Sequence, residues 1–503
     1  MLALAPAISP YADLAYDLLT AFYVLSVIAT IVVIISENRN PVKSLAWVTV
    51  LILLPIMGLV LYILFGRSLK GRHLISRKGR RKLLASHAPQ HVDPNRLPFT
   101  DETRQQIQLV NNLTGAQYFT GDEIEIFTSG QEKFDALKRD IQAATDHIHI
   151  QYYIYENDRI GREIRDMLIA KARQGVKVRV MYDHVGSFTI NAAFFKRMRR
   201  EGIEAHPFLE LTFTKLANRL NWRNHRKVVV IDGRVGYIGG MNIADRYVTG
   251  DRHHTTPWRD THLRITGPAV AALQYSFAVD WNFMSRDLLA ATIPEFGQVD
   301  LNATSGMQIV PSGPTDLWSN ISMVFIKAIT LAKHTVFIQT PYFLPSDALL
   351  KALQSAALAG VDVRLMMPRN PDSRLLKLAS GSYIKQCLQA GIKVYFYEPT
   401  MMHSKLVLVD DEFVTTGSTN FDFRSFEHNF ECNALIYSRE FNRRMRAIFA
   451  DDQRHCTRII LSHWRRRPVT TKALESLARL LSPIRCRNLK IIHQNSPCGM
   501  PSG

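Results

Sequence analysis

Residues 224–242 read N-H-R-K-V-V-V-I-D-G-R-V-G-Y-I-G-G-M-N, and the same pattern returns at residues 403–420 as H-S-K-L-V-L-V-D-D-E-F-V-T-T-G-S-T-N. In both copies Lys follows His by two positions, Asp by seven, Gly by fourteen and Asn by seventeen. The matched pairs are His225/His403, Lys227/Lys405, Asp232/Asp410, Gly239/Gly417 and Asn242/Asn420. A lone His-x-Lys is most simply an exposed strand end, whereas five matching spacings in two copies indicate a repeated functional motif.

Each copy contains a short apolar run that predicts a buried strand, Val228–Ile231 in the first and Leu406–Val409 in the second. Side chains two positions apart on a strand share a face, so the His and Lys of each copy point the same way. This pair suits a phosphate, because the ammonium supplies positive charge and a neutral imidazole can attack phosphorus or move a proton. We expect further hydrogen bonds to a bound phosphate from Asn242, Ser418 and Asn420.

The duplication extends beyond the two motifs. Residues 172–180, A-R-Q-G-V-K-V-R-V, parallel residues 357–365, A-L-A-G-V-D-V-R-L. Strand and helix patterns alternate in both regions, with strands predicted at 147–155, 176–182, 335–340 and 361–367 and helices at 161–174 and 348–358. We therefore expect an α/β fold of two repeated domains, residues 119–303 and 304–468, each with a mixed β-sheet flanked by helices.

The signature H-x-K-x4-D-x6-G-[GS]-x-N, present twice, resembles the paired motif of the phospholipase D superfamily. Four further stretches are similar to bacterial cardiolipin synthases: E-N-R-N-P-V-K-S-L-A-W at 37–47, W-R-D-T-H-L-R-I-T-G-P-A-V at 258–270, T-P-Y-F-L-P-S-D at 340–347 and R-S-F-E-H-N-F-E at 424–431. The resemblance covers about residues 12 to 484. It implies that the two domains pack face to face, so that both motifs line one cleft.

By this resemblance the candidate catalytic residues are His225, Lys227, Asp232, His403, Lys405 and Asp410. One His attacks phosphorus and forms a phosphohistidine intermediate while the other protonates the departing alcohol, and the family favours His225 as the nucleophile. Each imidazole needs a carboxylate to fix its tautomer. Glu431 matches the family's position for the partner of His403, and Asp260 is the analogous candidate for His225. The two motif aspartates end their strands, where orienting a loop is favoured over contact with substrate.

The N-terminal region holds two apolar segments, residues 18–35 and 44–65. At about 1.5 Å per residue, each is long enough to cross a hydrocarbon core of about 30 Å. A signal peptide is disfavoured because no Lys or Arg precedes the first segment, whereas Asp13 and Asp17 do. We expect residues 1–66 to form a transmembrane hairpin.

A basic juxtamembrane segment and linker are expected at residues 67–118, and residues 67–82 alone carry eight Lys or Arg. Positive-inside counting then places the connector 37–43 outside and everything after Phe65 in the cytoplasm. The sequence thus predicts a multi-pass protein of the bacterial inner (cytoplasmic) membrane with its catalytic domains on the cytoplasmic side.

The net charge of +18 over 503 residues indicates a polyanionic partner. Two apolar segments beside a basic run favour an anionic lipid surface over nucleic acid. The five cysteines show no C-x-x-C pairing, and His and carboxylates do not cluster at ligand spacing, so neither a metal ion nor another cofactor is expected.

By resemblance, the reaction is the transfer of a phosphatidyl group from one phosphatidylglycerol to another, which gives cardiolipin and glycerol. A phospholipase D-type hydrolase and another phosphatidyltransferase are the nearest alternatives. A nuclease is disfavoured by the two apolar segments, and a non-catalytic scaffold is disfavoured because all ten motif positions are filled.

The C-terminal segment 469–503 contains an amphipathic pattern at 473–481, with Leu474, Leu477 and Leu480 on one face. An ordinary surface helix and a helix lying in a membrane interface fit this pattern equally well. We expect residues 485–503 to be disordered.

Overall fold

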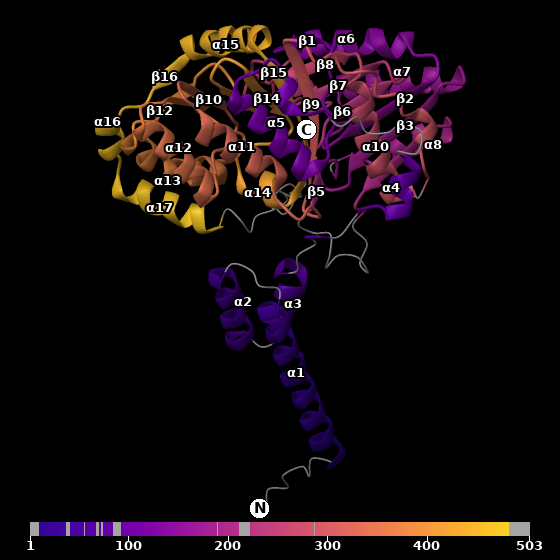
Figure 1. Cartoon of the computed structure of the whole chain (residues 1–503). Coiled ribbons are helices and arrows are strands. Elements are labelled where there is room, and N and C mark those ends of the chain that lie inside the picture. The colour runs from indigo at the N-terminus through magenta and orange to yellow at the C-terminus, as the bar shows by residue number, and fades with distance from the viewer. Residues whose placement is uncertain are drawn as a thin grey trace, which may run out of the picture. The chain divides into compact units, whose positions relative to one another are not determined.

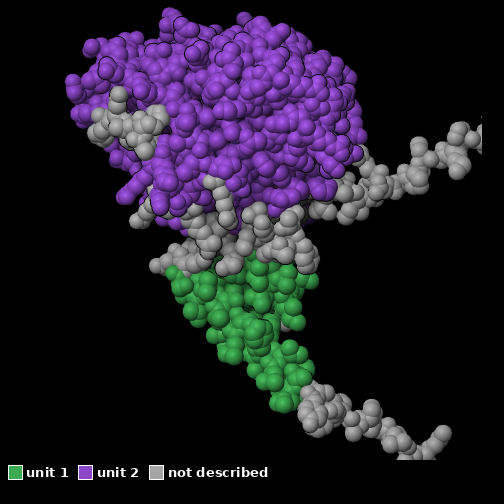
Figure 2. Space-filling model, turned by 90° about the vertical axis from the view of Figure 1, so that its right-hand side faces the viewer, with its two compact units in different colours: residues 1–68, 211–221 green, residues 69–210, 222–503 purple. Residues whose placement is uncertain are grey.

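The structure is a computed structural model of the chain. It describes residues 10–36, 41–54, 56–66, 70–71, 74–83, 92–188, 190–210, 222–285 and 287–481, so the predicted disorder at 485–503 lies outside the described residues. The chain divides into two compact units, residues 1–68 with 211–221 (unit 1) and residues 69–210 with 222–503 (unit 2), which Figure 2 shows in different colours. Both sequence repeats therefore belong to one unit.

Unit 1 contains one long apolar helix, α1 (Pro10–Ser36). Among the described residues, its Asp13–Ser36 stretch is the one helix long and apolar enough to cross a membrane. This agrees with the first predicted span, which lies inside α1.

The second predicted span, residues 44–65, differs from the prediction because it is not one continuous helix. It forms α2 (Pro41–Leu53), α3 (Met57–Leu61) and a π-helical turn, η1 (Tyr62–Gly66). The rings of Trp47 and Tyr62 lie 5.4 Å apart, whereas a straight helix would separate two positions fifteen residues apart by about 22 Å. The segment therefore folds back on itself, as Figure 1 shows for α2 and α3. Each arm is shorter than a hydrocarbon core.

In unit 2 the first repeat forms a seven-stranded sheet in the order β1-β8-β7-β6-β2-β3-β4. Strands β2, β3 and β4 are parallel, and the remaining pairs are antiparallel. The bounds are β1 Glu123–Phe127, β2 His147–Tyr152, β3 Lys177–Asp183, β4 Glu204–Phe208, β6 Val228–Ile231, β7 Val235–Gly239 and β8 His262–Thr266. Helices α6 Gly130–Ala143, α7 Arg159–Arg173, α8 Ala192–Arg200 and α10 Val270–Ser285 accompany it.

The second repeat builds an equivalent sheet in the order β16-β12-β11-β10-β13-β14-β15-β5, with β9 also paired to β15. The strands are β5 Arg223–Asn224, β9 Ser305–Ser312, β10 Thr335–Gln339, β11 Asp362–Pro368, β12 Lys393–Tyr397, β13 Leu406–Val409, β14 Phe413–Gly417, β15 Asn429–Ser438 and β16 Cys456–Arg458. The helices are α11 Asn320–Leu331, α12 Asp347–Leu358, α13 Arg374–Gln389, α14 Phe423–Glu427, α15 Arg439–Arg454, α16 Leu461–Arg465 and α17 Val469–Leu481. The predicted pair of mixed sheets flanked by helices is confirmed (Figure 1).

The predicted linker at 67–118 contains more structure than its composition indicated. It includes α4 (Arg77–Leu83), η2 (Pro94–Arg96) and α5 (Asp101–Thr114). Helix α5 begins after Thr100, whose hydroxyl accepts the Thr103 N–H, and ends at Gly115 in the left-handed conformation. Its buried positions pack into the core of the second repeat, which a sequence window without a strong apolar pattern did not predict.

The two repeats are joined by backbone pairing beside the motifs. Strand β5, which belongs to the first repeat in sequence, pairs in parallel with β15 of the second. The isolated bridge between Arg259 and Met402 is the corresponding contact on the other side. This interlocking places the start of each motif against the opposite repeat.

Candidate active site

Each motif histidine is held by the backbone of the other repeat. The His225 N–H donates to the Phe430 carbonyl at 2.8 Å, and the His403 N–H donates to the Arg259 carbonyl at 2.7 Å. Phe430 and Arg259 directly precede Glu431 and Asp260 in sequence. The same arrangement thus occurs twice, once in each repeat.

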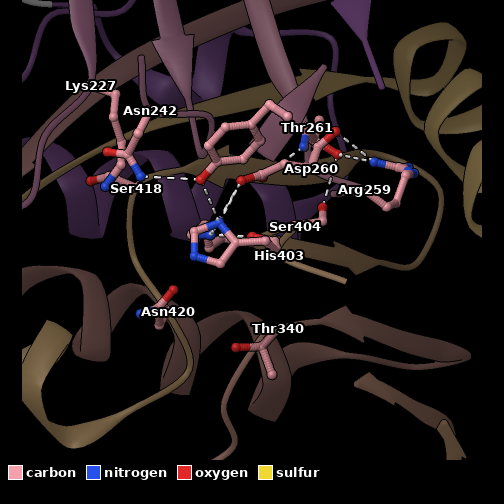
Figure 3. Close-up of polar contacts among 12 residues, drawn as sticks. Lys227, Asn242, Arg259, Asp260, Thr261, Thr340, His403, Ser404, Ser418 and Asn420 are labelled. Atoms are coloured by element: carbon pink, nitrogen blue, oxygen red, sulfur yellow. Dashed lines mark hydrogen bonds and ion pairs between the residues drawn. The ribbon is translucent and has the colours of Figure 1, made fainter. Parts of the chain in front are cut away.

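The carboxylate partners are exchanged between the repeats. The Nδ1 atom of His225 lies 3.0 and 3.1 Å from the two carboxylate oxygens of Glu431, and Nδ1 of His403 lies 2.6 Å from Asp260. The predicted pairs, Glu431 with His403 and Asp260 with His225, are therefore wrong. Figure 3 shows Asp260 and His403 pointing toward each other. The cause is the backbone pairing, which brings each histidine beside the strand of the other sheet.

Both carboxylates are fully buried and charged. Burial raises the pKa of Glu431, but the adjacent His225 and Lys227 lower it below the ordinary value of a glutamate. Burial likewise raises the pKa of Asp260, and Lys405 and His403 lower it. A carboxylate at Nδ1 keeps the proton on that nitrogen, so the lone pair of each imidazole lies on Nε2.

Both imidazoles are neutral at pH 7. Burial, with a contribution from Lys227, lowers the pKa of His225 to about 4, although Glu431 opposes the shift. Burial and Lys405 lower the pKa of His403 to about 3, again against its carboxylate. A neutral imidazole with a free Nε2 lone pair can act as a nucleophile or a base.

The two lysines are buried beside their histidines, as the strand spacing predicted. Nζ of Lys227 donates to the His225 carbonyl at 2.6 Å, and Nζ of Lys405 donates to the His403 carbonyl. Burial lowers the pKa of Lys405 to about 8, with Asp260 as the main opposing charge. The site therefore presents ammonium groups in a low-dielectric setting, where they attract an anion strongly.

Among the defined positions of the motif, the two copies differ at one, Gly240 against Ser418. The Ser418 hydroxyl donates to Glu431 at 2.5 Å and accepts the Cys432 N–H at 2.9 Å, so it orients the carboxylate. Its contact with phosphate stays a prediction. A Cβ on Gly240 would stand 2.1 Å from Asp260 Oδ1. The Asp260 carboxylate therefore leaves no room for a serine side chain at position 240.

The motif asparagines are buried in the site. Oδ1 of Asn242 accepts the Ile154 N–H at 3.2 Å, and its Nδ2 donates to the Tyr247 hydroxyl at 3.1 Å. That hydroxyl lies 3.3 Å from Nδ1 of His403. Nδ2 of Asn420 donates to Asp422 at 3.2 Å.

The motif aspartates lie at the other ends of their strands and orient loops, as the strand-end argument favoured. Asp232 accepts the N–H groups of Thr145, Asp146 and His147. Asp410 accepts those of Lys333, His334 and Thr335, each at 2.8 Å. Because β6 and β13 separate these carboxylates from the histidines, their place among the candidate catalytic residues is corrected to a structural one.

Among the described residues, no group of three His, Cys, Asp or Glu side chains lies close enough to hold a metal ion. The cationic side chains beside the two histidines are those of Lys227 and Lys405.

Comparison with known proteins agrees with this geometry. The family model described as "Cardiolipin synthase, PLD-like domain" matches residues 137–281 and 325–453, and the "Phospholipase_D-nuclease N-terminal" model matches residues 24–67. The major cardiolipin synthase ClsA of Bacillus subtilis is 40% identical over 476 residues, which cover 93% of this chain and 98% of that protein. A cardiolipin synthase of Geobacillus kaustophilus is 38% identical over 465 residues, 91% of this chain and 92% of its own. The chain belongs to the cardiolipin synthase family.

Members of this family are phosphatidyltransferases, so the predicted enzyme class is confirmed at the level of the family. A phosphatidylserine synthase of Haemophilus influenzae has the same fold, with a TM-score of 0.57 at 15% identity over 76% of this chain and 98% of that chain. The apolar helix α1 and the match at residues 24–67 indicate association with a membrane.

Sequence reasoning missed four residues that support the site of this cardiolipin synthase family member. Buried Arg226 donates to the Glu431 carbonyl at 2.9 Å and pairs with Asp280 at 2.5 Å. Buried Arg259 donates to the Asp260 carbonyl at 2.7 Å and pairs with Asp452 at 2.7 Å. Each arginine thus fixes the backbone of one histidine's carboxylate. The signal was their adjacency to the motif His and Asp, but their acidic partners are distant in sequence.

Proposed function

We propose that this chain transfers a phosphatidyl group from one phosphatidylglycerol to the terminal hydroxyl of a second, which gives cardiolipin and glycerol. The observation that supports it most is the exchange of carboxylates, because each imidazole is oriented only when both repeats are present. One phosphodiester then meets two oriented imidazoles and two ammonium groups. Family membership supplies the substrate class.

In the first half-reaction, Nε2 of one histidine attacks phosphorus, and the bond from phosphorus to the glycerol oxygen breaks. The departing oxygen takes a proton from the other histidine. Burial lowers the pKa of each histidine, but a phosphate monoanion beside the ring raises that pKa and lets the histidine carry the proton. We assign attack to His225, as the family resemblance implies, and proton transfer to His403.

In the second half-reaction, His403 accepts the proton from the hydroxyl of a second phosphatidylglycerol. The new oxygen–phosphorus bond forms as the nitrogen–phosphorus bond breaks, which restores neutral His225. Water competes with the lipid alcohol, but the reacting groups are buried, with His225 8% and His403 4% exposed. Confinement of the lipid at a membrane surface raises its effective concentration further.

We propose that Lys227 and Lys405 neutralise the phosphoryl oxygens as charge develops, with Asn242 and Asn420 as further donors. Such donors typically contribute about 3–4 kcal/mol to the barrier. Replacing either lysine by Met should therefore lower kcat about 10²–10³-fold. Asp260, Glu431 and Ser418 are positioning residues.

The test is purified full-length protein in phosphatidylglycerol vesicles without added metal or nucleotide. Glycerol and cardiolipin should appear in equal amounts, and His225→Ala and His403→Ala should abolish turnover and cardiolipin formation. In His403→Ala, a slow first half-reaction should release at most one glycerol per chain and leave a phosphatidyl group on His225, which mass spectrometry detects. An adduct on His403 in His225→Ala would reverse the assignment. Phosphatidic acid as the sole product would show that water is the acceptor and overturn the transferase proposal.

We also propose that the catalytic unit faces the cytoplasm and that the chain crosses the membrane once, through α1. The folded-back segment α2–α3 then enters and leaves on one side. This places Arg39, Lys43 and the basic run 67–82 together on the cytoplasmic side and leaves the flank with Asp13 outside, which satisfies the positive-inside rule better than two crossings.

Labelling of intact cells with a membrane-impermeant thiol reagent tests this orientation. The first native cysteine is Cys387, so a cysteine introduced into the N-terminal region is the one thiol there. A single crossing predicts that Ala7→Cys is labelled and Asn38→Cys is protected. Two crossings predict the reverse pattern for the same two variants.

A further inference from the structure

Unit 2 has exposed apolar and basic side chains that take no part in the proposed reaction. The loop between β9 and α11 presents Leu317 and Trp318 to solvent, 64% and 54% exposed. The loop is well held: Asp316 accepts the Gly313 N–H and the Asn320 amide at 2.8 Å each. The two large apolar side chains therefore project from an ordered turn.

This loop is bonded to the first described residues of unit 2, Lys70 and Gly71. The Gly71 N–H donates to the Thr315 carbonyl at 3.0 Å, and Lys70 pairs at 3.1 Å with Glu427, which also accepts the Ser319 hydroxyl. Three residues, 67–69, separate Lys70 from Gly66, the last residue of η1. At most about 3.6 Å per residue, this connection keeps the loop within reach of the bilayer that holds the hairpin.

A second apolar feature is helix α17. It packs on the second repeat through Ala478 and through Glu475, which pairs with Arg467 at 3.0 Å. Yet Leu474, Leu477 and Leu480 remain 54%, 53% and 73% exposed. The two sequence interpretations of this helix are thus compatible, because one face packs on the domain and another is left without a protein partner among the described residues.

Basic charge accompanies these apolar groups. Helix α4 is fixed by Leu83 to a hydrophobic core that both repeats share, and it exposes Lys78, Arg81 and Lys82. In Figure 1, α4, α14, β5 and α17 all lie along the lower edge of unit 2. Strand β5 ends one residue before His225, and α14 begins three residues after Asn420, so this edge also flanks both motifs.

We propose that this edge of unit 2 docks directly on an anionic lipid bilayer, with Leu317, Trp318 and the leucines of α17 inserted and the α4 cations on the headgroups. Trp is favoured at the level of the headgroups, and exposed apolar side chains beside Lys and Arg are typical of interfacial binding. The docked edge would present the cleft to lipid headgroups, so that substrate enters from the bilayer without crossing water.

Fluorescence of full-length protein in phosphatidylglycerol vesicles with bromine-labelled acyl chains tests the contact without using activity. Bromine quenches tryptophans that touch the acyl chains. The share of emission that Trp318→Phe removes should be strongly quenched, whereas the share that the fully buried Trp281→Phe removes should not be. An unquenched Trp318 would overturn the docking proposal.

Activity supplies the second arm, which rests on the proposed function. Leu317→Ser/Trp318→Ser should lower kcat/KM on bilayer phosphatidylglycerol about tenfold and leave it unchanged on a short-chain analogue below its micelle concentration. Leu358→Ser, on α12 and 73% exposed, is the matched control. Equal loss on both substrates would show a damaged site and overturn docking as the cause.

The charge contribution has its own matched pair. Lys78→Gln/Arg81→Gln should weaken activity on anionic vesicles more than Arg443→Gln/Arg444→Gln, which lie on α15 along the upper edge (Figure 1). Identical effects of the two double substitutions would show that α4 is not part of the docking surface. If Trp318 is quenched while the wild-type protein forms no cardiolipin, the docking proposal is supported and the proposed reaction is wrong.

Discussion

At the level of single side chains, the site is defined by two similar but unequal dyads. His225 is served by Glu431, which Ser418 orients, and His403 by Asp260, which has Gly240 behind it. An inequality of this kind suits a reaction in which one imidazole forms a bond to phosphorus and the other only moves a proton. The lysines differ less, since both are buried and both donate to the carbonyl of their own histidine.

The pH dependence of kcat/KM should follow Lys405. Its pKa is lowered to about 8 by burial, so the ammonium is present below that pH and is lost as pH rises through it. Because phosphate binding needs the charge, kcat/KM should fall more steeply with pH above about 8 than below it. Steady-state rates on a short-chain phosphatidylglycerol measure this profile. A slope that does not change between about pH 7 and pH 10 would show that Lys405 keeps its proton or is not required.

Among the elements, the loops after β6 and β13 show how a motif residue can be structural. Asp232 and Asp410 have positive φ values of 52° and 44°. Each carboxylate closes a turn by accepting three backbone N–H groups at the start of a neighbouring strand, β2 for Asp232 and β10 for Asp410. Left-handed backbone costs most residues about 1–2 kcal/mol, and Asp and Asn tolerate it best. The spacing of seven residues after the histidine is thus a requirement of the turn.

Asp410→Ala should lower the free energy of unfolding by about 2–3 kcal/mol, because it strains the turn and leaves three N–H groups without their acceptor. The rate per folded molecule should stay near that of the wild type. Asp410→Asn, which tolerates the backbone and keeps one acceptor oxygen, should lose less stability. Thermal unfolding together with kcat separates the two effects, and a large loss of kcat at unchanged stability would return Asp410 to the chemistry.

At the scale of the whole chain, both repeats contribute to each dyad. β5 pairs with β15, and the backbone of each motif histidine bonds to the opposite repeat. A single repeat would therefore leave each imidazole without its carboxylate. The buried pair Arg259–Asp452 crosses this interface. Arg226 pairs with Asp280 within the first repeat and crosses the interface by donating to the Glu431 carbonyl. Removing one partner of such a buried pair typically costs about 3–5 kcal/mol.

Because one chain completes one site, two defective chains should not rescue each other. Equal amounts of His225→Ala and His403→Ala protein in the same vesicles should form no cardiolipin above the level of either alone. Wild-type protein diluted into His403→Ala protein is the control for interference. Recovery of activity in the mixture would show that repeats from different chains combine.

The spacing of apolar and charged residues was enough to predict one strand in each motif, β6 and β13, and the alternation of β2, α7 and β3 with β10, α12 and β11. It also predicted that His and Lys of each motif share a face. These features depend on local periodicity, which a sequence displays directly. Glu431 and Asp260 were selected from the family resemblance and not from local periodicity. Local pattern did not reveal helix α5 or the fold-back of residues 41–66, because both depend on what the segment packs against.

What only the tertiary structure decided is which carboxylate serves which histidine. Sequence distance favours Glu431 for His403, 28 residues away, yet the imidazole of His225 lies against it across 206 positions. The physical reason is that backbone hydrogen bonds between repeats, not chain proximity, set the neighbours of each imidazole. The sequence determined which histidines and carboxylates are present, and the interface between the two sheets determined how they pair.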